Sequence, residues 1–128
     1  MNVAVLGASN KPERYSNRAV LLLAEKGHTV FPVHPALAEI DGHLVSKRLS
    51  DIPVSLDTVT MYVSPAHSTG LADEILEAKP RRAIFNPGTE NPELEARLAE
   101  GGIDVLHACT LVMLRTDQFD APHAKDPV

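Results

Sequence analysis

Short apolar runs recur along this chain, and most of them are separated by stretches long enough to form a helix. The runs cover residues 3–6, 29–33, 58–63, 83–85 and 103–106. Continuous apolar runs of this length are typical of strands that are buried on both faces of a parallel sheet. Strands that alternate with helices are joined by right-handed crossovers, which place helices on both faces of the sheet. The pattern therefore predicts an α/β domain with five main parallel strands.

Helix signals lie between these runs. Residues 16–26 carry an apolar stripe at helical spacing, and Gly27 ends it. A further helix is expected to begin near Ser64-Pro65. Another begins at Asn91-Pro92, where asparagine is a good N-cap and proline fits the first helical position, and Gly101-Gly102 ends it.

The segment between residues 36 and 57 is less regular. Residues 43–45 predict a short edge strand, and residues 50–53 predict a single helical turn. Pro32 lies inside an apolar run, where it cannot donate to a sheet, so we place it near the end of its strand. Residues 115–128 lack apolar periodicity and are interpreted as a loose tail that follows a single domain formed by residues 1–114.

Composition and charge exclude several classes of function. The chain has 128 residues, of which 44% are hydrophobic and 23% charged, as expected for one globular domain. Its net charge of -5 disfavours nucleic acid and anionic membranes as partners, because both are held by an excess of basic residues. A phosphate-binding site would therefore need a local cluster of basic residues. The sequence has neither a signal peptide nor an apolar run long enough to span a bilayer, and a single cysteine cannot form an internal disulfide, so we expect a cytoplasmic protein.

The first apolar run leads into Gly7-Ala8-Ser9 and then into a helix, which is half of a nucleotide-binding βαβ unit. A dinucleotide dehydrogenase would need Gly-x-Gly-x-x-Gly at this turn and an acidic residue at the end of the second strand for the ribose hydroxyl. Only Gly7 is present, and the second run ends at Val33-His34-Pro35. The sequence therefore has the outline of a dinucleotide site without its two diagnostic features.

Ligands of a doubly wound sheet bind at the carboxyl ends of its strands, near the point where the strand order reverses. The residues that follow each run are small, polar or proline-containing, and they form the set of candidates for ligand binding. These candidates are Gly7, Ala8, Ser9, Asn10, Lys11, His34, Pro35, Ser64, Pro65, His67, Asn86, Pro87, Gly88 and Cys109. The start of the helix that follows the first run adds Arg14, Tyr15 and Ser16, because a helix N-terminus can hold an anion.

At these positions the sequence resembles the small stand-alone CoA-binding proteins, which are similar to the N-terminal CoA-binding domain of the succinyl-CoA synthetase α subunit. The resemblance covers residues 2–114. It rests on residues 5–9 followed by Pro12, Arg14 and Ser16, on residues 31–35, on the turn that ends at Ile52-Pro53, and on Cys109. The sequence departs from the family where His34 replaces the usual asparagine, and at residues 86–91.

The resemblance implies a Rossmann-like doubly wound fold that binds coenzyme A or an acyl-CoA. Backbone amides of Gly7-Ala8-Ser9 and of the start of the following helix would approach phosphate. Lys11 and Arg14 would supply the local positive charge. The missing acidic residue after Val33 would suit a phosphorylated ribose, because a carboxylate there would repel the phosphate.

Each candidate also has a simpler interpretation. Gly7 suits any strand-to-helix turn, Lys11 and Arg14 suit a solvated loop, and a histidine at a strand end needs no ligand. Cys109 invites a catalytic role, because His107 is close in sequence and a short apolar helix is expected to follow, but a structural thiol explains it better. No cysteine or histidine cluster has the spacing of a metal site, and no nucleophile elbow is present.

The sequence thus favours a CoA or acyl-CoA binding protein without catalytic machinery of its own. The main alternative is an NAD(P)-binding oxidoreductase or redox sensor on the same fold, since Lys11 or Arg14 would also suit the 2′-phosphate of NADP. A third interpretation is an interaction module that has lost its ligand. The sequence leaves open whether the ligand is free CoA or a thioester, and whether the chain forms a homo-oligomer.

Overall fold

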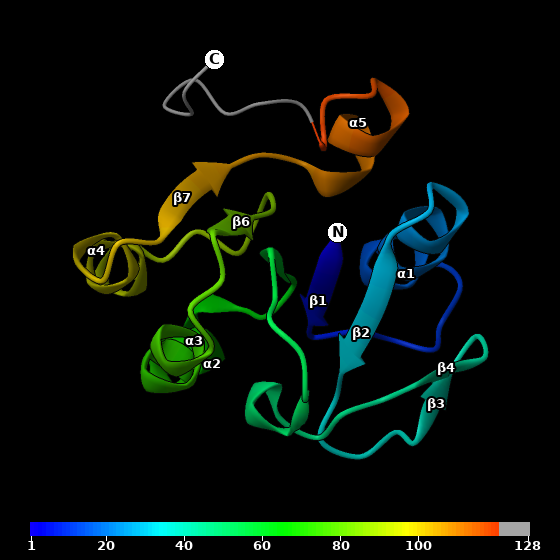
Figure 1. Cartoon of the computed structure of the whole chain (residues 1–128), viewed down its shortest axis with the longest axis horizontal. Helices are drawn as coiled ribbons and strands as arrows, with labels where there is room; N and C mark the ends of the chain where they lie inside the picture. The colour runs from blue at the N-terminus through cyan, green and yellow to red at the C-terminus, as the bar shows by residue number, and fades with distance from the viewer. Residues whose placement is uncertain (121–128) are drawn as a thin grey trace.

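A five-stranded parallel sheet forms the centre of the molecule (Figure 1). The computed structural model describes residues 1–120. The order of the strands in the sheet is β2-β1-β5-β6-β7, and every neighbouring pair is parallel. The strands are β1 (Asn2–Leu6), β2 (Thr29–Val33), β5 (Thr58–Met61), β6 (Arg82–Phe85) and β7 (Asp104–His107). The predicted α/β fold with five parallel strands is confirmed.

Helices cover both faces of this sheet, so the domain is doubly wound and Rossmann-like (Figure 1). The helices α1 (Tyr15–Glu25) and α5 (Thr110–Arg115) pack on one face, and α3 (Ala72–Ala78) and α4 (Pro92–Glu100) pack on the other. Successive side chains of a strand point to opposite faces. In β1, Val3 and Val5 accordingly join the core under α1, whereas Ala4 and Leu6 join the core under α3, and none of the four is more than 4% exposed.

The helix expected from Ser64-Pro65 onward is interrupted. The short helix α2 (Pro65–Ser68) is followed by a 3-10 turn, η2 (Thr69–Leu71), before α3 begins. The amide of Asn91, the N-cap of α4, donates hydrogen bonds to the hydroxyls of Ser68 and Thr69 at 2.9 Å each. These bonds fix the interrupted turn, and Gly70 within it is a poor helix former.

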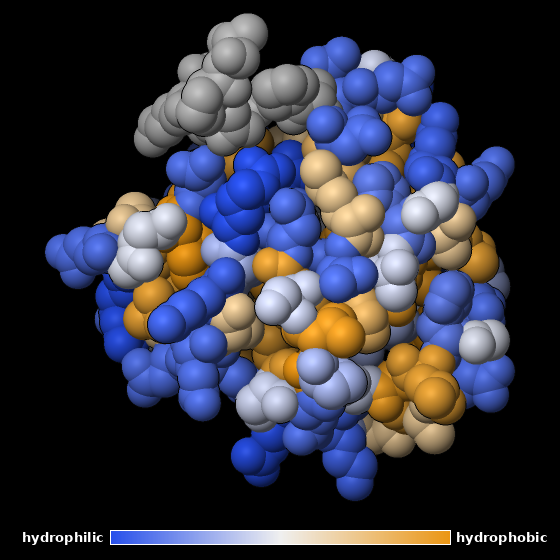
Figure 2. All heavy atoms as spheres, in the orientation of Figure 1, coloured by the Kyte–Doolittle hydropathy of each residue, from blue (hydrophilic) through white to orange (hydrophobic). Residues whose placement is uncertain are grey.

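The irregular segment forms a small β-hairpin rather than an edge strand of the main sheet. The strands β3 (Glu39–Ile40) and β4 (His43–Leu44) pair with each other in antiparallel fashion. A single bridge between Val33 and Ser46 connects this segment to β2. The predicted helical turn is present as η1 (Leu49–Asp51). Leu44 is 85% exposed, and Figure 2 shows an apolar patch over the hairpin.

Pro32 lies next to the end of β2, as predicted, and it interrupts no hydrogen bond of the sheet. Its carbonyl accepts from the N–H of Ser46, on the side of β2 that faces away from β1. The nitrogen and the carbonyl of one strand residue point to the same side, so the missing N–H of Pro32 also faces away from β1. The edge position of β2 therefore tolerates the proline.

The segment that follows α5 packs against the sheet. Phe119 is 1% exposed, and its ring centre lies 4.4 Å from the guanidinium of Arg82. The ring centres of Phe119 and His28 are 5.0 Å apart. The packed domain therefore extends at least to Phe119, beyond the predicted limit at Leu114, because a single buried aromatic residue leaves no periodic pattern in the sequence. Residues 121–128 of the predicted tail lie outside the described residues. None of the described helices is long and apolar enough to cross a membrane.

Candidate functional site

The candidate site is a cleft at the carboxyl ends of the central strands. From β1 the chain passes to β2 on one side and later to β5 on the other side, so the strand order reverses between β1 and β5. Crevices at such switch points are the usual ligand sites of doubly wound sheets. The cleft has a volume of about 830 Å³, which lies within the range of small-molecule sites.

Most of the predicted residues line this cleft. They come from the loop after β1, the turn after β2 and the segments that follow β5 and β6. The predicted residues that line it are Gly7, Ala8, Ser9, Asn10, Lys11, Arg14, Tyr15, Ser16, His34, Pro35, Ser64, His67, Pro87 and Gly88. The structure adds Leu37, Tyr62, Val63 and Thr89 to the lining. Tyr62 and Val63 were missed because the apolar run at residues 58–63 placed them inside a strand. In the structure β5 ends earlier, at Met61.

The cleft differs in charge from the chain as a whole. Lys11 and Arg14 line it together with the imidazoles of His34 and His67, whereas no aspartate or glutamate among residues 1–120 does. The whole chain has a net charge of -5. Within the described residues, no ion pair involves Lys11 or Arg14. The cleft is therefore a basic island in an acidic protein, and its cations are available to an anion.

The backbone at the start of the cleft requires glycine. Gly7 has a φ of +83°, in the left-handed region that favours glycine. A Cβ atom at this position would lie 2.7 Å from the carbonyl oxygen of Tyr62, which follows the neighbouring strand β5. Gly7 thus lets the loop after β1 close against the end of β5. This packing requirement holds with or without a ligand.

Internal hydrogen bonds shape the loop between β1 and α1. The hydroxyl of Ser9 accepts from the N–H of Lys11 at 3.1 Å, and the carbonyl of Lys11 accepts from the N–H of Arg14 at 3.0 Å. Arg14 is the N-cap residue of α1 and has an extended backbone. The first N–H groups of α1 therefore face the region of Lys11 and Arg14 without helical partners, which is favourable for binding an anion.

Asn17 connects the loop after β1, which lines the cleft, to the hairpin. Its side chain is 1% exposed, and its amide donates to the carbonyl of Ser9 at 2.8 Å and to Oδ2 of Asp41 at 2.7 Å. Ser9 belongs to the loop after β1, and Asp41 lies between β3 and β4 at the tip of the hairpin. Sequence reasoning missed this connection, because the apolar stripe of α1 does not show that a polar residue in its first turn is buried.

His34 caps the turn after β2. Its Nδ1 atom accepts hydrogen bonds from the N–H groups of Ala36 and Leu37 at 3.0 and 3.1 Å. The neutral ring therefore carries its proton on Nε2. Asparagine, which the resembled family usually has before this proline, can accept the same bonds through its side-chain oxygen. The departure at His34 thus preserves the geometry of the turn.

Ser64 and His67 form a hydrogen-bonded pair in the cleft. The Ser64 hydroxyl and Nδ1 of His67 are 2.9 Å apart, and Ser64 is the N-cap of α2. Within the part of the chain that the structure describes, no acidic side chain hydrogen-bonds to His67. Pro65, the first residue of α2, is exposed and does not line the cleft.

Asn86 and Cys109 were predicted as ligand residues, but neither lines the cleft. The buried amide of Asn86 donates to Oγ1 of Thr60 at 2.7 Å and to the carbonyl of Met61 at 2.9 Å. Its Oδ1 atom accepts from the N–H of Thr110 at 2.8 Å. Asn86 therefore joins β5, the end of β6 and α5. Cys109 is half-buried and is the N-cap residue of α5.

Tyr62 contributes a neutral phenol to this region. Burial raises the pKa of Tyr62 to about 12, so its hydroxyl stays protonated at neutral pH. The hydroxyl is buried and makes no hydrogen bond of normal geometry with any described residue, although the hydroxyls of Thr110 and Thr60 lie nearby. Tyr62 therefore adds no charge to the cleft.

Comparisons with known sequences identify the family of this chain. A family model described as CoA binding domain matches residues 1–115. The curated protein YneT of Bacillus subtilis (strain 168), described as uncharacterized, is 28% identical over 116 residues, which cover 84% of this chain and 86% of YneT. The match spans nearly the whole of both proteins.

Solved structures share the fold. An uncharacterized protein known from a crystal structure is 38% identical, with a TM-score of 0.82 over 92% of this chain and 97% of that chain. A dinucleotide forming acetyl-coenzyme A synthetase from Ca. Korarchaeum cryptofilum, solved with phosphate and ADP, is 26% identical, with a TM-score of 0.74 over 83% of this chain and 25% of that chain. The resemblance found in the sequence is confirmed, and the chain belongs to the CoA-binding domain family.

Proposed function

We propose that this protein binds coenzyme A, or one of its thioesters, in the cleft at the carboxyl ends of β1, β2 and β5. The observation that carries the proposal is the charge of the cleft, which Lys11 and Arg14 line and to which none of the described residues adds a carboxylate. Coenzyme A carries a pyrophosphate and a 3′-phosphate, so its nucleotide end needs such a basic island. Membership of the CoA-binding domain family supports the same ligand.

Separate parts of the cleft suit the two phosphate groups. The loop after β1 and the start of α1 offer backbone N–H groups, Arg14 suits bidentate contact with phosphate, and Lys11 acts as a compact charge. The turn after β2 has His34-Pro35 where a dinucleotide dehydrogenase has a carboxylate. A carboxylate there would repel a phosphorylated ribose, so its absence favours CoA over NAD.

A thermal-shift series tests the ligand. A ligand that binds only the folded state stabilises it, by about 2.7 kcal/mol when its concentration is a hundredfold above its dissociation constant. We expect CoA and acetyl-CoA to raise the melting temperature and NAD to leave it unchanged. Equal or larger stabilisation by NAD or NADP would contradict the assignment, and the NADP result would favour an oxidoreductase or redox sensor instead.

Variants of the basic residues test which phosphate each one contacts. A charge-assisted hydrogen bond contributes roughly 1.5 to 3 kcal/mol, so Lys11→Ala or Arg14→Ala should weaken CoA binding about tenfold or more in calorimetry. A residue at the 3′-phosphate should affect CoA more than dephospho-CoA, and a residue at the pyrophosphate should affect both equally. Arg115→Ala, an exposed charge at the end of α5, is the matched control and should keep the affinity. Wild-type affinity in both cleft variants would contradict the proposal.

We further infer that the protein binds its ligand without transforming it. The Ser64–His67 pair is the arrangement in the cleft most similar to a nucleophile and its base, but within the described residues it lacks the acidic group that orients such a histidine. We expect acetyl-CoA to stay intact in the presence of the protein, as measured with a reagent that detects the released thiol. Release above the uncatalysed rate that disappears in Ser64→Ala would show that the protein is a thioesterase.

A further inference from the structure

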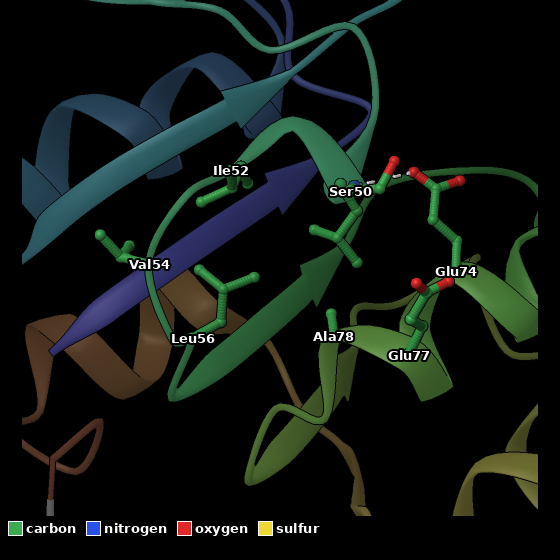
Figure 3. Close-up of a pocket in the computed structure, with 8 residues that line it drawn as sticks. Ser50, Ile52, Val54, Leu56, Glu74, Glu77 and Ala78 are labelled. Carbon is green, nitrogen blue, oxygen red and sulfur yellow. Dashed lines mark hydrogen bonds between the residues drawn. The ribbon is translucent and has the colours of Figure 1, made fainter.

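A second, smaller hollow lies on the α3 face of the sheet (Figure 3). It has a volume of about 200 Å³ and lies between α3 and the loop that leads from η1 to β5. The lining residues are Leu49, Ser50, Ile52, Val54, Leu56, Glu74, Glu77 and Ala78. None of them lines the cleft, so the two sites are separate.

One wall of this hollow is apolar. Leu49, Ile52 and Leu56 are buried and belong to the core under α3, while Val54 is partly exposed beside them. Figure 3 shows the apolar side chains of Ile52, Val54 and Leu56 along the loop and the two glutamates on α3 across from them. A group that enters the hollow would therefore contact aliphatic side chains on one side and carboxylates on the other.

The opposite wall is acidic and unpaired. Glu74 and Glu77 lie one helical turn apart, where like charges repel. Oε1 of Glu74 accepts from the N–H of Ser50 at 3.3 Å, but among the described residues neither carboxylate forms an ion pair. No basic residue of the described chain lines the hollow, and Lys79, which caps α3, lies outside the lining.

The size of the hollow restricts what it can hold. Small-molecule sites usually have volumes of roughly 300 to 1,000 Å³. At about 200 Å³ the hollow is better matched to one side chain than to a nucleotide. An aliphatic stem with a cationic end would satisfy both walls at once. Arginine fits best, because its planar guanidinium can hydrogen-bond to both carboxylates and loses less hydration than an ammonium group.

We propose that this hollow is a docking pocket for an arginine side chain of a protein partner. Pockets that bury an arginine or aromatic anchor are typical of the central contacts of protein interfaces. The complementary charge comes from the partner, since an incoming cation relieves the repulsion between Glu74 and Glu77. The protein would then hold an anion at the carboxyl ends of its strands and a basic protein segment on its α3 face.

An NMR titration with blocked amino acids tests the pocket. N-acetylarginine amide should shift the backbone signals of Ser50 and of residues 74–78 saturably, with a dissociation constant on the order of millimolar. N-acetylcitrulline amide has the same stem and a neutral end, and it should bind at least about fivefold more weakly because the charge-assisted bonds are lost. Glu74→Gln and Glu77→Gln should each weaken the arginine probe. Glu100→Gln, which changes an exposed carboxylate at the end of α4, is the matched control and should not.

Three results would overturn the proposal. Equal binding of the arginine and citrulline probes would mean that charge plays no part, and an absence of saturable shifts would mean that no pocket exists for this side chain. Concentration-dependent shifts of the same signals without a probe would assign the hollow to a second copy of this chain. Because the cleft and the hollow share no residues, a CoA titration reports on the proposed function independently.

Discussion

The amino and carboxyl ends of the central strands use charge in opposite ways. At the amino ends of β5 and β6, Arg81 forms an ion pair with Asp57 at 3.0 Å. Arg82 is only 2% exposed and donates to the hydroxyl of Thr58 at 2.7 Å and to the carbonyl of Phe119 at 2.6 Å. The charged groups at the amino ends therefore form hydrogen bonds and ion pairs within the protein.

At the carboxyl ends of β1 and β2, the cations form no ion pair with any of the described residues. Lys11 and Arg14 line the cleft, and turns built on Gly7 and His34 form its walls. A ligand can be held by charge only where the fold has not already neutralised that charge. We therefore expect the amino ends to determine stability and the carboxyl ends to determine affinity, and variants at each end can separate the two.

Arg82→Ala disrupts the interactions at the amino ends of β5 and β6 and should have the largest effect on stability. It removes two hydrogen bonds of a buried cation and its contact with the ring of Phe119. We expect the free energy of unfolding to fall by roughly 3 kcal/mol or more, which lowers the melting temperature by about 10 °C. The CoA affinity of the folded variant should stay within about twofold, because distant sites act independently.

A surface arginine provides the control for this variant. Arg97 pairs with Asp73, and both side chains are largely exposed. Arg97→Ala should therefore cost less than about 1 kcal/mol in denaturant unfolding. Similar losses in the two variants would mean that the burial of Arg82 does not stabilise the amino ends.

Gly7→Ala changes the loop after β1, at the carboxyl ends of the strands, and should affect both stability and affinity. The new methyl group would meet the carbonyl of Tyr62 at 2.7 Å in a backbone conformation that already disfavours alanine. We expect a loss of roughly 2 to 3 kcal/mol in chemical denaturation and weaker CoA binding, because the loop after β1 must move. Gly27→Ala is the matched control, because Gly27 has a φ of +89° and a Cβ atom there would have no described atom within 4 Å. It should cost about 1 kcal/mol and keep the affinity. Equal costs would show that the contact with Tyr62 imposes nothing.

Much of the fold was predictable because strands and helices are local patterns. The run at residues 29–33 coincides with β2, and the capping signals at Asn91-Pro92 mark the start of α4. The failures concern contacts between residues far apart in the sequence. Asn91 fixes the interruption before α3, and burial of Phe119 extends the domain, yet neither side chain carries a periodic signal.

The site was predictable to a similar degree and for the same reason. The rule that ligands bind after the strands located Lys11, because it needs only the order of the elements. Arg14 was located through the start of the helix that follows. The rule could not identify Asn17, whose two hydrogen bonds join segments that are distant in sequence. It also selected Asn86, a strand-end residue whose side chain forms hydrogen bonds within the protein and does not line the cleft.

The pH dependence of stability tests the role of His28, which lies at the amino ends of the strands. Burial, and then the N-terminal ammonium of Met1 and the guanidinium of Arg82, lower the pKa of His28, although Asp120 partly opposes them. The unfolded chain therefore binds a proton at a higher pH than the folded chain. Stability should fall as the pH drops below about 6.5, the ordinary pKa of histidine, until the lower folded pKa is passed. Urea unfolding across this range measures the slope.

Two variants isolate the contribution of His28. His28→Asn should reduce the slope of the unfolding free energy against pH, because it removes the titrating imidazole. His43→Asn, which changes a histidine of the hairpin, leaves His28 intact and should keep the slope. An unchanged slope in His28→Asn would assign the acid sensitivity to other groups.

Cys109→Ser tests whether the ligand-binding region extends along the carboxyl ends of the strands as far as β7, and its effect should be the smallest. Cys109 follows β7 and is half-buried at the start of α5, but it does not line the cleft. Serine is a good N-cap, so we expect the free energy of unfolding to change by less than about 0.5 kcal/mol. The CoA affinity of this variant should be unchanged in calorimetry. In the wild-type protein, mass spectrometry after incubation with oxidised CoA should show no mixed disulfide at Cys109, because exchange needs a thiolate that the incoming sulfur can reach. A mixed disulfide that excess reduced CoA prevents would instead place the thiol end of the ligand beside β7, and the region that binds the ligand would then extend across the sheet from β2 to its far edge.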